Sequence, residues 1–267
     1  MAERMKLDGV DLAYEGRPGS AGKATIVLVH GLGGSINSWW AQLAACEAAG
    51  HPCVAYDQRG AGLSTKPSGP YSVEQWADDL VALLDALEVE RPVLVAHSVG
   101  CMVAEQASAR LGERIAGLMT IGGALRWRPE SEPVFEERVK LARAGRMDEI
   151  ATTVVGTGLS EARRASDPVL VGLFRDLIAS NEPQAYAECS AATAVGEMVD
   201  TERVACPVLA SCGEHDPVAS PAFAEAIASA VPDGRTATVA GAAHWCHLEA
   251  PEQVNEVMLG FASELAT

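Results

Sequence analysis

The chain has 267 residues, of which 48% are hydrophobic and 21% are charged, and its formal net charge is −16. The apolar share is sufficient for a sizeable core, so global disorder is excluded, and an α/β chain of this length can form a single domain. The acidic balance argues against nucleic acid and against an anionic membrane surface as partners, because both require clustered positive charge.

Residues 1–16 carry charges throughout and contain no apolar segment, so no signal peptide is predicted. No run along the chain approaches the roughly 20 apolar residues that a membrane span requires. The seven cysteines, from Cys46 to Cys246, are an odd number without paired spacing. Reduced thiols explain them best, and we therefore expect a cytoplasmic protein.

Short apolar runs in the first half of the chain predict strands that are buried on both faces of a sheet. These runs are Ala24–Gly31, Cys53–Asp57, Pro92–Ser98 and Ile115–Gly123. Helical patterns lie between them: one follows Ser72, which forms a capping box with Gln75, and another covers Val99–Leu111. This alternation predicts an α/β fold with a mostly parallel sheet and helices on both faces.

The pattern changes over residues 125–201, where strand-like runs disappear. Helical segments such as Val134–Arg143 and Pro168–Ser180 take their place. We expect this block to be a helical cap, inserted after the sixth strand into a core formed by residues 1–124 and 202–267.

Ser98 lies where a predicted buried strand turns into a helix, within Ala96-His97-Ser98-Val99-Gly100. A side chain on such a turn stands at the carboxyl edge of the sheet, where open α/β sheets bind ligands. The turn needs small residues two positions before and after the serine, and alanine takes the first of these positions in place of the usual glycine. The alternative is a serine N-cap at an ordinary helix start.

The two strands predicted after the cap each lead into a loop with a candidate partner for this serine. Asp216 follows Cys206–Gly213, and His244 follows Arg235–Gly241. A serine hydroxyl is a poor nucleophile until a base removes its proton, and histidine has a suitable pKa. The carboxylate would fix the tautomer of the base and stabilise its protonated form. The order Ser98, Asp216, His244 therefore predicts a catalytic triad.

Three other histidines compete for the role of the base. His247 is the strongest competitor, but His244 begins the pattern H-x-x-x-x-E-x-P, which Glu249 and Pro251 complete. His97 neighbours the serine in sequence and should point to the other side of its strand. His215 precedes the candidate acid and is expected at the surface or behind the acid. We therefore assign the base to His244.

The glycine-rich segment His30–Gly34 ends the first buried strand, where glycines allow the backbone to approach a ligand closely. The N–H groups of Leu32 and Val99 would form an oxyanion hole. A phosphate-binding loop is the alternative, but the segment lacks the P-loop lysine and the dinucleotide spacing. A zinc site at His244–His247 would need a second ligand pair, so we expect no metal and no cofactor.

These motifs resemble the α/β-hydrolase superfamily of serine hydrolases along the whole chain, from HGLGG through YDQRGAGLS (Tyr56–Ser64) and AHSVG to the C-terminal histidine loop. Among its subfamilies the chain is most similar to the 3-oxoadipate enol-lactonase-like group. The similarity lies in the length of the helical insertion and in NEPQAY (Asn181–Tyr186).

The resemblance implies hydrolysis of a small carboxylic ester or lactone through an acyl-serine intermediate. With the same triad, cleavage of a carbon–carbon bond next to a ketone, perhydrolase activity and thioester hydrolysis stay open. A small-molecule receptor on the same fold is an alternative of another class, because fold alone does not fix function. Self-association into a homo-oligomer is compatible with the sequence.

A pocket enclosed by the cap should hold roughly 300–1,000 Å³. We expect it to be lined by aromatic and cationic side chains near its mouth, namely Trp39, Trp127, Trp245, Arg126 and Arg128. The arginines would bind a substrate carboxylate, as an enol-lactonase-like substrate would require. Alternatively, the tryptophans fill gaps between cap and core, and the arginines are ordinary surface residues.

Overall fold

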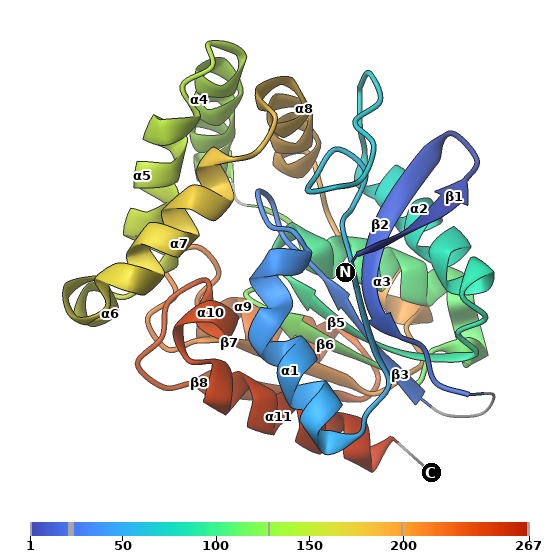
Figure 1. Ribbon diagram of the computed structural model, residues 1–267. Coiled ribbons are helices and arrows are strands. Elements are labelled where there is room, and N and C mark those ends of the chain that lie inside the picture. Colours follow the sequence, from blue (N-terminus) through green and yellow to red (C-terminus); the bar gives the residue numbers. More distant parts are fainter. Residues whose placement is uncertain (1, 21–23, 128, 199, 266–267) are drawn as a thin grey trace.

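A mixed sheet of eight strands forms the centre of the computed structural model, which describes residues 2–20, 24–127, 129–198 and 200–265. The spatial order of the strands is β1-β2-β4-β3-β5-β6-β7-β8 (Figure 1). Their bounds are β1 Glu3–Leu7, β2 Val10–Arg17, β3 Ala24–Val29, β4 Cys53–Tyr56, β5 Arg91–His97, β6 Gly117–Ile121, β7 Val208–Gly213 and β8 Gly234–Val239.

The helices that follow these strands have the bounds α1 Trp40–Ala49, α2 Val73–Ala86, α3 Val99–Leu111, α4 Glu132–Arg143, α5 Met147–Gly158, α6 Glu161–Ser166, α7 Pro168–Ala179, α8 Pro183–Ala194, α9 Pro221–Ala230, α10 Cys246–Glu249 and α11 Pro251–Glu264. The predicted cap of α2 is present, since the Ser72 hydroxyl accepts a hydrogen bond from the Gln75 N–H at 3.1 Å. The mostly parallel α/β fold predicted from the sequence is confirmed.

Strands β3 to β8 pair with their neighbours in parallel. β1 and β2 form an antiparallel hairpin, and β2 also pairs with β4 in the antiparallel direction. The sequence patterns located β3 to β8 and missed this hairpin. The residues of β1 are exposed or half-buried. It therefore carries no continuous apolar run to mark it.

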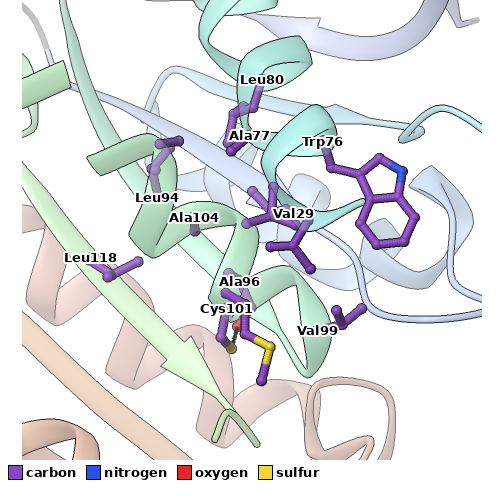
Figure 2. Close-up of a cluster of buried hydrophobic side chains, with 14 of the residues drawn as sticks. Val29, Trp76, Ala77, Leu80, Leu94, Ala96, Val99, Cys101, Ala104 and Leu118 are labelled. Atoms are coloured by element: carbon purple, nitrogen blue, oxygen red, sulfur yellow. Dashed lines mark hydrogen bonds between the residues drawn. The ribbon is translucent and has the colours of Figure 1, made fainter. Parts of the chain in front are cut away.

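Alternate residues of the central strands pack on opposite faces of the sheet, as the pleat of a strand requires. Val27 and Val29 belong to the cluster that contains the buried faces of α2, α3 and α9. Figure 2 shows part of this cluster, including Trp76 and Leu80 of α2 together with Val29 of β3. Ile26 packs on the other face, in the cluster formed with α1 and α11. Both faces are thus buried, so these strands read as uninterrupted apolar runs.

Helices α4 to α8 form an insertion between β6 and β7, and Figure 1 shows them (green to brown) grouped on one side of the molecule. An antiparallel bridge between Arg126 and Glu197 joins the two ends of this insertion. The insertion has its own apolar cluster, which also contains Trp245 and Leu248 from the chain beyond β8. The helices of the insertion therefore pack against the segment that carries His244.

All seven cysteines are free and buried. Burial raises the pKa of the thiols of Cys101, Cys189 and Cys206 to about 12. A hydrogen bond with Cys53 lowers the pKa of Cys46, which is also buried. In the part of the chain that the structure describes, no helix has the length and apolar character of a membrane span.

Candidate active site

Ser98 occupies a strained turn between the end of β5 and the start of α3. Its backbone has φ 54° and ψ −124°, a region that residues with a side chain rarely adopt. The Ser98 N–H donates to the Ile121 carbonyl at 2.9 Å, which fixes the turn against β6. This conformation lifts the hydroxyl above the edge of the sheet and distinguishes Ser98 from an ordinary N-cap serine, whose φ is negative.

Small residues on both sides of Ser98 permit this turn. A Cβ on Gly100 would lie 2.6 Å from the His30 carbonyl oxygen and 2.7 Å from that of Val29, so only glycine fits. Ala96 is fully buried within β5, and its carbonyl accepts a weak hydrogen bond from the Cys101 thiol at 3.2 Å. Alanine is accommodated here because its methyl group joins the core cluster between β5 and the helices.

The three predicted triad residues form one hydrogen-bonded chain. His244 Nε2 lies 3.1 Å from Ser98 Oγ, and His244 Nδ1 lies 2.8 Å from Asp216 Oδ2. The other carboxylate oxygen of Asp216 accepts the N–H groups of Val218 and Ala219, each at 2.8 Å. All three side chains are buried. With a proton on Nδ1 directed to Asp216, Nε2 is free to accept the proton of the serine.

The competing histidines lie around this chain without replacing any member of it. The His97 ring lies on the α1 and α11 face of the sheet and donates to the His244 carbonyl at 3.1 Å. His247 is fully buried and stacks on Trp39, with ring centroids 4.4 Å apart. Neither ring nitrogen of His247 has a hydrogen-bond partner within the described residues. His215 is exposed.

Burial of an unpartnered imidazole makes stability depend on pH. Burial lowers the pKa of His247 to about 3, and it also lowers the pKa of His97. Below the unfolded-state pKa of about 6.5 the unfolded chain binds a proton that folded His247 does not, so stability falls as pH decreases. At pH 5 the loss caused by His247 is about 2 kcal/mol.

The variant His247→Phe keeps the ring and removes this titration. Urea unfolding at pH 7.5 and pH 5 should show a difference in unfolding free energy that is about 2 kcal/mol smaller than in the wild type. The exposed His215, replaced in the same way, serves as the control and should leave that difference unchanged. An unchanged difference in His247→Phe would contradict the prediction.

A small cavity lies next to Ser98 and is lined by the two candidate oxyanion-hole residues. Ser98 itself does not line it, but an added Cβ on the lining residue Gly31 would lie 2.9 Å from Ser98 Cβ. Leu32 and Val99 both line it, together with Gly31, and its volume is about 20 Å³. Val99 opens α3, so its N–H has no carbonyl one turn earlier and points to the cavity end of the helix. The volume suffices for about one water molecule. It is far below the 300–1,000 Å³ or so that a substrate pocket was expected to hold.

Side chains of the insertion account for this small volume. Asn181, Tyr186 and Cys189 line the cavity from above, and Tyr186 and Cys189 are buried. These side chains leave little space next to the two candidate oxyanion-hole residues. The enclosed substrate pocket stays a prediction.

The tryptophans predicted for the pocket lie in packed regions instead. Trp39 is fully buried against His247 in the core beneath the sheet. Trp127 packs on Phe135 at the base of the insertion, with ring centroids 6.0 Å apart. Trp245 packs in the same way on Phe174, at 4.7 Å. None of the three lines the cavity beside Ser98. They fill space within the core and between core and insertion.

Of the two arginines predicted to bind a substrate carboxylate, the structure describes only Arg126. Arg126 is exposed, and its backbone forms the bridge that joins the two ends of the insertion. It does not line the cavity beside Ser98. Arg128 lies outside the described residues.

Gly122 is a site residue that the sequence analysis did not identify. It follows β6 with φ 59°, and a Cβ there would lie 2.9 Å from His244 Nδ1 and 3.1 Å from Asp216 Oδ2. The side chains of Asp216 and His244 therefore pack directly on its backbone. The available signal was the glycine pair at the end of a predicted strand, but its importance depends on contacts with two distant loops.

Glu249 is a second such residue, since the sequence pattern used it only to mark the histidine loop. Its carboxylate is buried and accepts the Ala243 N–H at 2.8 Å, next to the base. It also accepts the N–H of Ser160 at 3.1 Å and the hydroxyl of Ser160, at the start of α6. Arg163 donates to the Glu249 carbonyl at 2.7 Å. One carboxylate thus joins the histidine loop to the insertion.

Comparison with known proteins gives consistent matches. The model of a family described as alpha/beta hydrolase fold matches residues 24–251. The chain is 25% identical to 3-oxoadipate enol-lactonase 2 of Acinetobacter baylyi, over 90% of this chain and 89% of that protein. It is 27% identical to a protein of Escherichia coli O7:K1 named "Putative carbamate hydrolase RutD", over 93% and 95% of the two chains. Among solved structures, the enol-lactonase of Burkholderia xenovorans LB400 superposes with a TM-score of 0.90 at 26% identity, covering 98% of this chain and all of that one.

Proposed function

Because the chain belongs to the alpha/beta hydrolase fold family, we propose that it hydrolyses a small carboxylic ester or lactone through an acyl-serine intermediate. The observation that carries the proposal is the hydrogen-bonded chain from Asp216 through His244 to Ser98. That chain ends on a serine whose strained backbone presents the hydroxyl at the edge of the sheet.

In the first half of the reaction, His244 Nε2 takes the proton of Ser98 as Oγ attacks the carbonyl carbon of the substrate. Asp216 stabilises the imidazolium that forms. The carbonyl oxygen becomes an oxyanion, which the N–H groups of Leu32 and Val99 bind. The tetrahedral intermediate collapses, and His244 returns the proton to the leaving alcohol. In a lactone that alcohol stays attached to the acyl group.

The second half repeats these steps with water. His244 removes a proton from a water molecule, whose oxygen attacks the acyl carbon, and Ser98 Oγ leaves with the proton from His244. The product is a carboxylic acid. Each step uses the same base and the same oxyanion donors, so one arrangement of groups serves both halves.

The enol-lactonase relatives support a lactone substrate, which is a cyclic ester and requires the same chemistry. Carbamate hydrolysis is a second candidate, favoured by the relative whose name contains that activity. A carbamate carbonyl would undergo the same attack by Ser98, and its amine would receive the proton from His244. Assays on lactones and on carbamates separate the two.

A fluorophosphonate probe tests the nucleophile. It should label Ser98 and no other residue, as determined by mass spectrometry of proteolytic fragments. Among the described residues, only this hydroxyl combines a histidine nitrogen at 3.1 Å with a strained turn. Labelling should be absent in Ser98→Ala, and labelling of that variant would contradict the assignment. A panel of p-nitrophenyl esters, lactones, vinylogous diketones and carbamates, assayed on both proteins, then identifies the bond that is cleaved.

A further inference from the structure

An apolar groove of about 1,090 Å³ lies between α7 of the insertion and the segment that leads into α1. Figure 1 shows α7 (yellow) within the insertion at the left and α1 (blue) on the front of the core. Large apolar side chains that are exposed line the groove from both sides, namely Trp40, Leu63, Val169 and Leu173. Exposed apolar patches of this kind mark binding surfaces more often than chance.

The core side of the groove is held rigidly by one buried carboxylate. Asp57 accepts the N–H of Ile36 and the N–H of Leu63, each at 2.6 Å. It is 1% exposed. These two bonds fasten the segment before Trp40 and the loop of Leu63 to the end of β4. The groove therefore has a preformed wall on this side.

The groove and the cavity beside the nucleophile share Gly33 and Asn181 as lining residues. The Asn181 amide donates to the Gly33 carbonyl at 3.1 Å. Gly33 follows Leu32, one of the two oxyanion-hole residues. This hydrogen bond, with Ile178 and Tyr186 beside Gly33, lies between the open groove and a space that holds about one water molecule.

The charges around the groove are unfavourable for an anion. Asp176 and Glu252 line it and are exposed. Its cations are already engaged: Arg163 forms an ion pair with Asp167 at 3.6 Å, and the Lys66 ammonium donates to backbone carbonyls at 2.7 and 3.0 Å. The net charge of −16 adds to the repulsion of anions at long range.

We propose that this groove binds an uncharged apolar arm of the ester, which reaches Ser98 when the Asn181 side chain moves away from Gly33. This inference rests on the proposed hydrolase function and narrows its substrate class. The arm removes the exposed apolar surface of Val169 and Leu173 from water. This movement breaks the hydrogen bond between the Asn181 amide and the Gly33 carbonyl. Substrates with a carboxylate on that arm bind poorly, in contrast to the dicarboxylate expected of an enol-lactonase-like enzyme.

Three matched esters test the proposal: p-nitrophenyl acetate, p-nitrophenyl hexanoate and the mono-p-nitrophenyl ester of adipic acid. The last two have the same chain length and differ in a terminal carboxylate. The wild type should show a kcat/KM for the hexanoate about tenfold above those for the acetate and the adipate. The preference over the adipate should shrink in 1 M salt, because screening weakens the repulsion.

A pair of valine variants locates the preference. Val169→Ser, within the groove, should lower the hexanoate-to-acetate ratio of kcat/KM about threefold, and adding Leu173→Ser should lower it further. Val195→Ser is the control, since Val195 is 82% exposed and does not line the groove. It should leave the ratio unchanged. Asn181→Ala should raise kcat/KM for the hexanoate relative to the acetate, because the hydrogen bond to the Gly33 carbonyl that separates groove and cavity is lost.

The outcomes separate this inference from the proposed function. One outcome is hydrolysis of all three esters at Ser98 with the same hexanoate-to-acetate ratio of kcat/KM in the wild type, Val169→Ser and Val195→Ser. It would overturn the proposal for the groove and leave the proposed hydrolase function intact. A preference for the adipate ester would overturn the exclusion of anions. Absence of hydrolysis together with absence of fluorophosphonate labelling would overturn both proposals.

Discussion

Replacing His244 with alanine is expected to lower kcat by about 10⁶-fold, the size of effect measured when the base of a serine triad is removed. The reason is geometric: Nε2 lies 3.1 Å from Ser98 Oγ, and no other histidine in the described residues forms a hydrogen bond with that hydroxyl. Without the base, the serine keeps its proton and attacks too slowly. The measurement is single-turnover acylation by a p-nitrophenyl ester.

His247→Ala is the matched control for this variant. His247 lies three positions along the same loop and is equally buried, but it stacks on Trp39 and does not contact the serine by a hydrogen bond. It should keep most of the activity and lose stability instead. The double variant Ser98→Ala/His244→Ala should be no slower than either single variant, because the two residues act as a unit. A reversal between His244 and His247 would mean that the base has been misassigned.

Replacing Gly122 with alanine is expected to lower kcat about 100-fold, although the glycine takes no part in the chemistry. The added Cβ would lie 2.9 Å from His244 Nδ1 and 3.1 Å from Asp216 Oδ2, so the acid and the base must shift. A displacement of about 1 Å in a catalytic group is enough for a loss of this size. The measurement is kcat for p-nitrophenyl acetate.

Gly145→Ala separates this collision from ordinary backbone strain. Gly145 has a similar positive φ of 73°, but an added Cβ there meets no atom within 4 Å. Both variants should lose about 1 kcal/mol of stability from the unfavourable backbone region. Only Gly122→Ala should lose activity. Equal kcat values in the two variants would show that the contact with the triad does not matter.

The features predicted well from the sequence were those that depend on local pattern. Strands β3 to β7 are buried on both faces and carry continuous apolar runs, which make them recognisable in the sequence. β8 lies at the edge of the sheet, and most of its residues are exposed or half-buried. Ser98, Asp216 and His244 follow β5, β7 and β8, and parallel strands end at the same edge of the sheet. Their proximity therefore follows from the topology.

Features that depend on packing between distant segments were not predictable in the same way. Trp39 follows the glycine-rich segment His30–Gly34, and Trp245 follows His244, yet both are buried by contacts with other rings. Nothing local to the chain determines whether a tryptophan faces a cavity or fills one. The size of the cavity depends on how Tyr186 and Asn181 of the insertion meet the core. Gly122 gains its importance only from the loops of Asp216 and His244.

The burial of every native thiol makes it practical to measure the position of the insertion relative to the core in solution. Alkylating reagents attack thiolates that they can reach, and the seven cysteines here are all enclosed by the fold. A cysteine introduced on the outer surface would then be the sole accessible target for a maleimide or a nitroxide. Spin labels at exposed positions such as Arg175 on α7 and Glu256 on α11 would report the distance between insertion and core, with and without ligand, in a protein that keeps all its native cysteines.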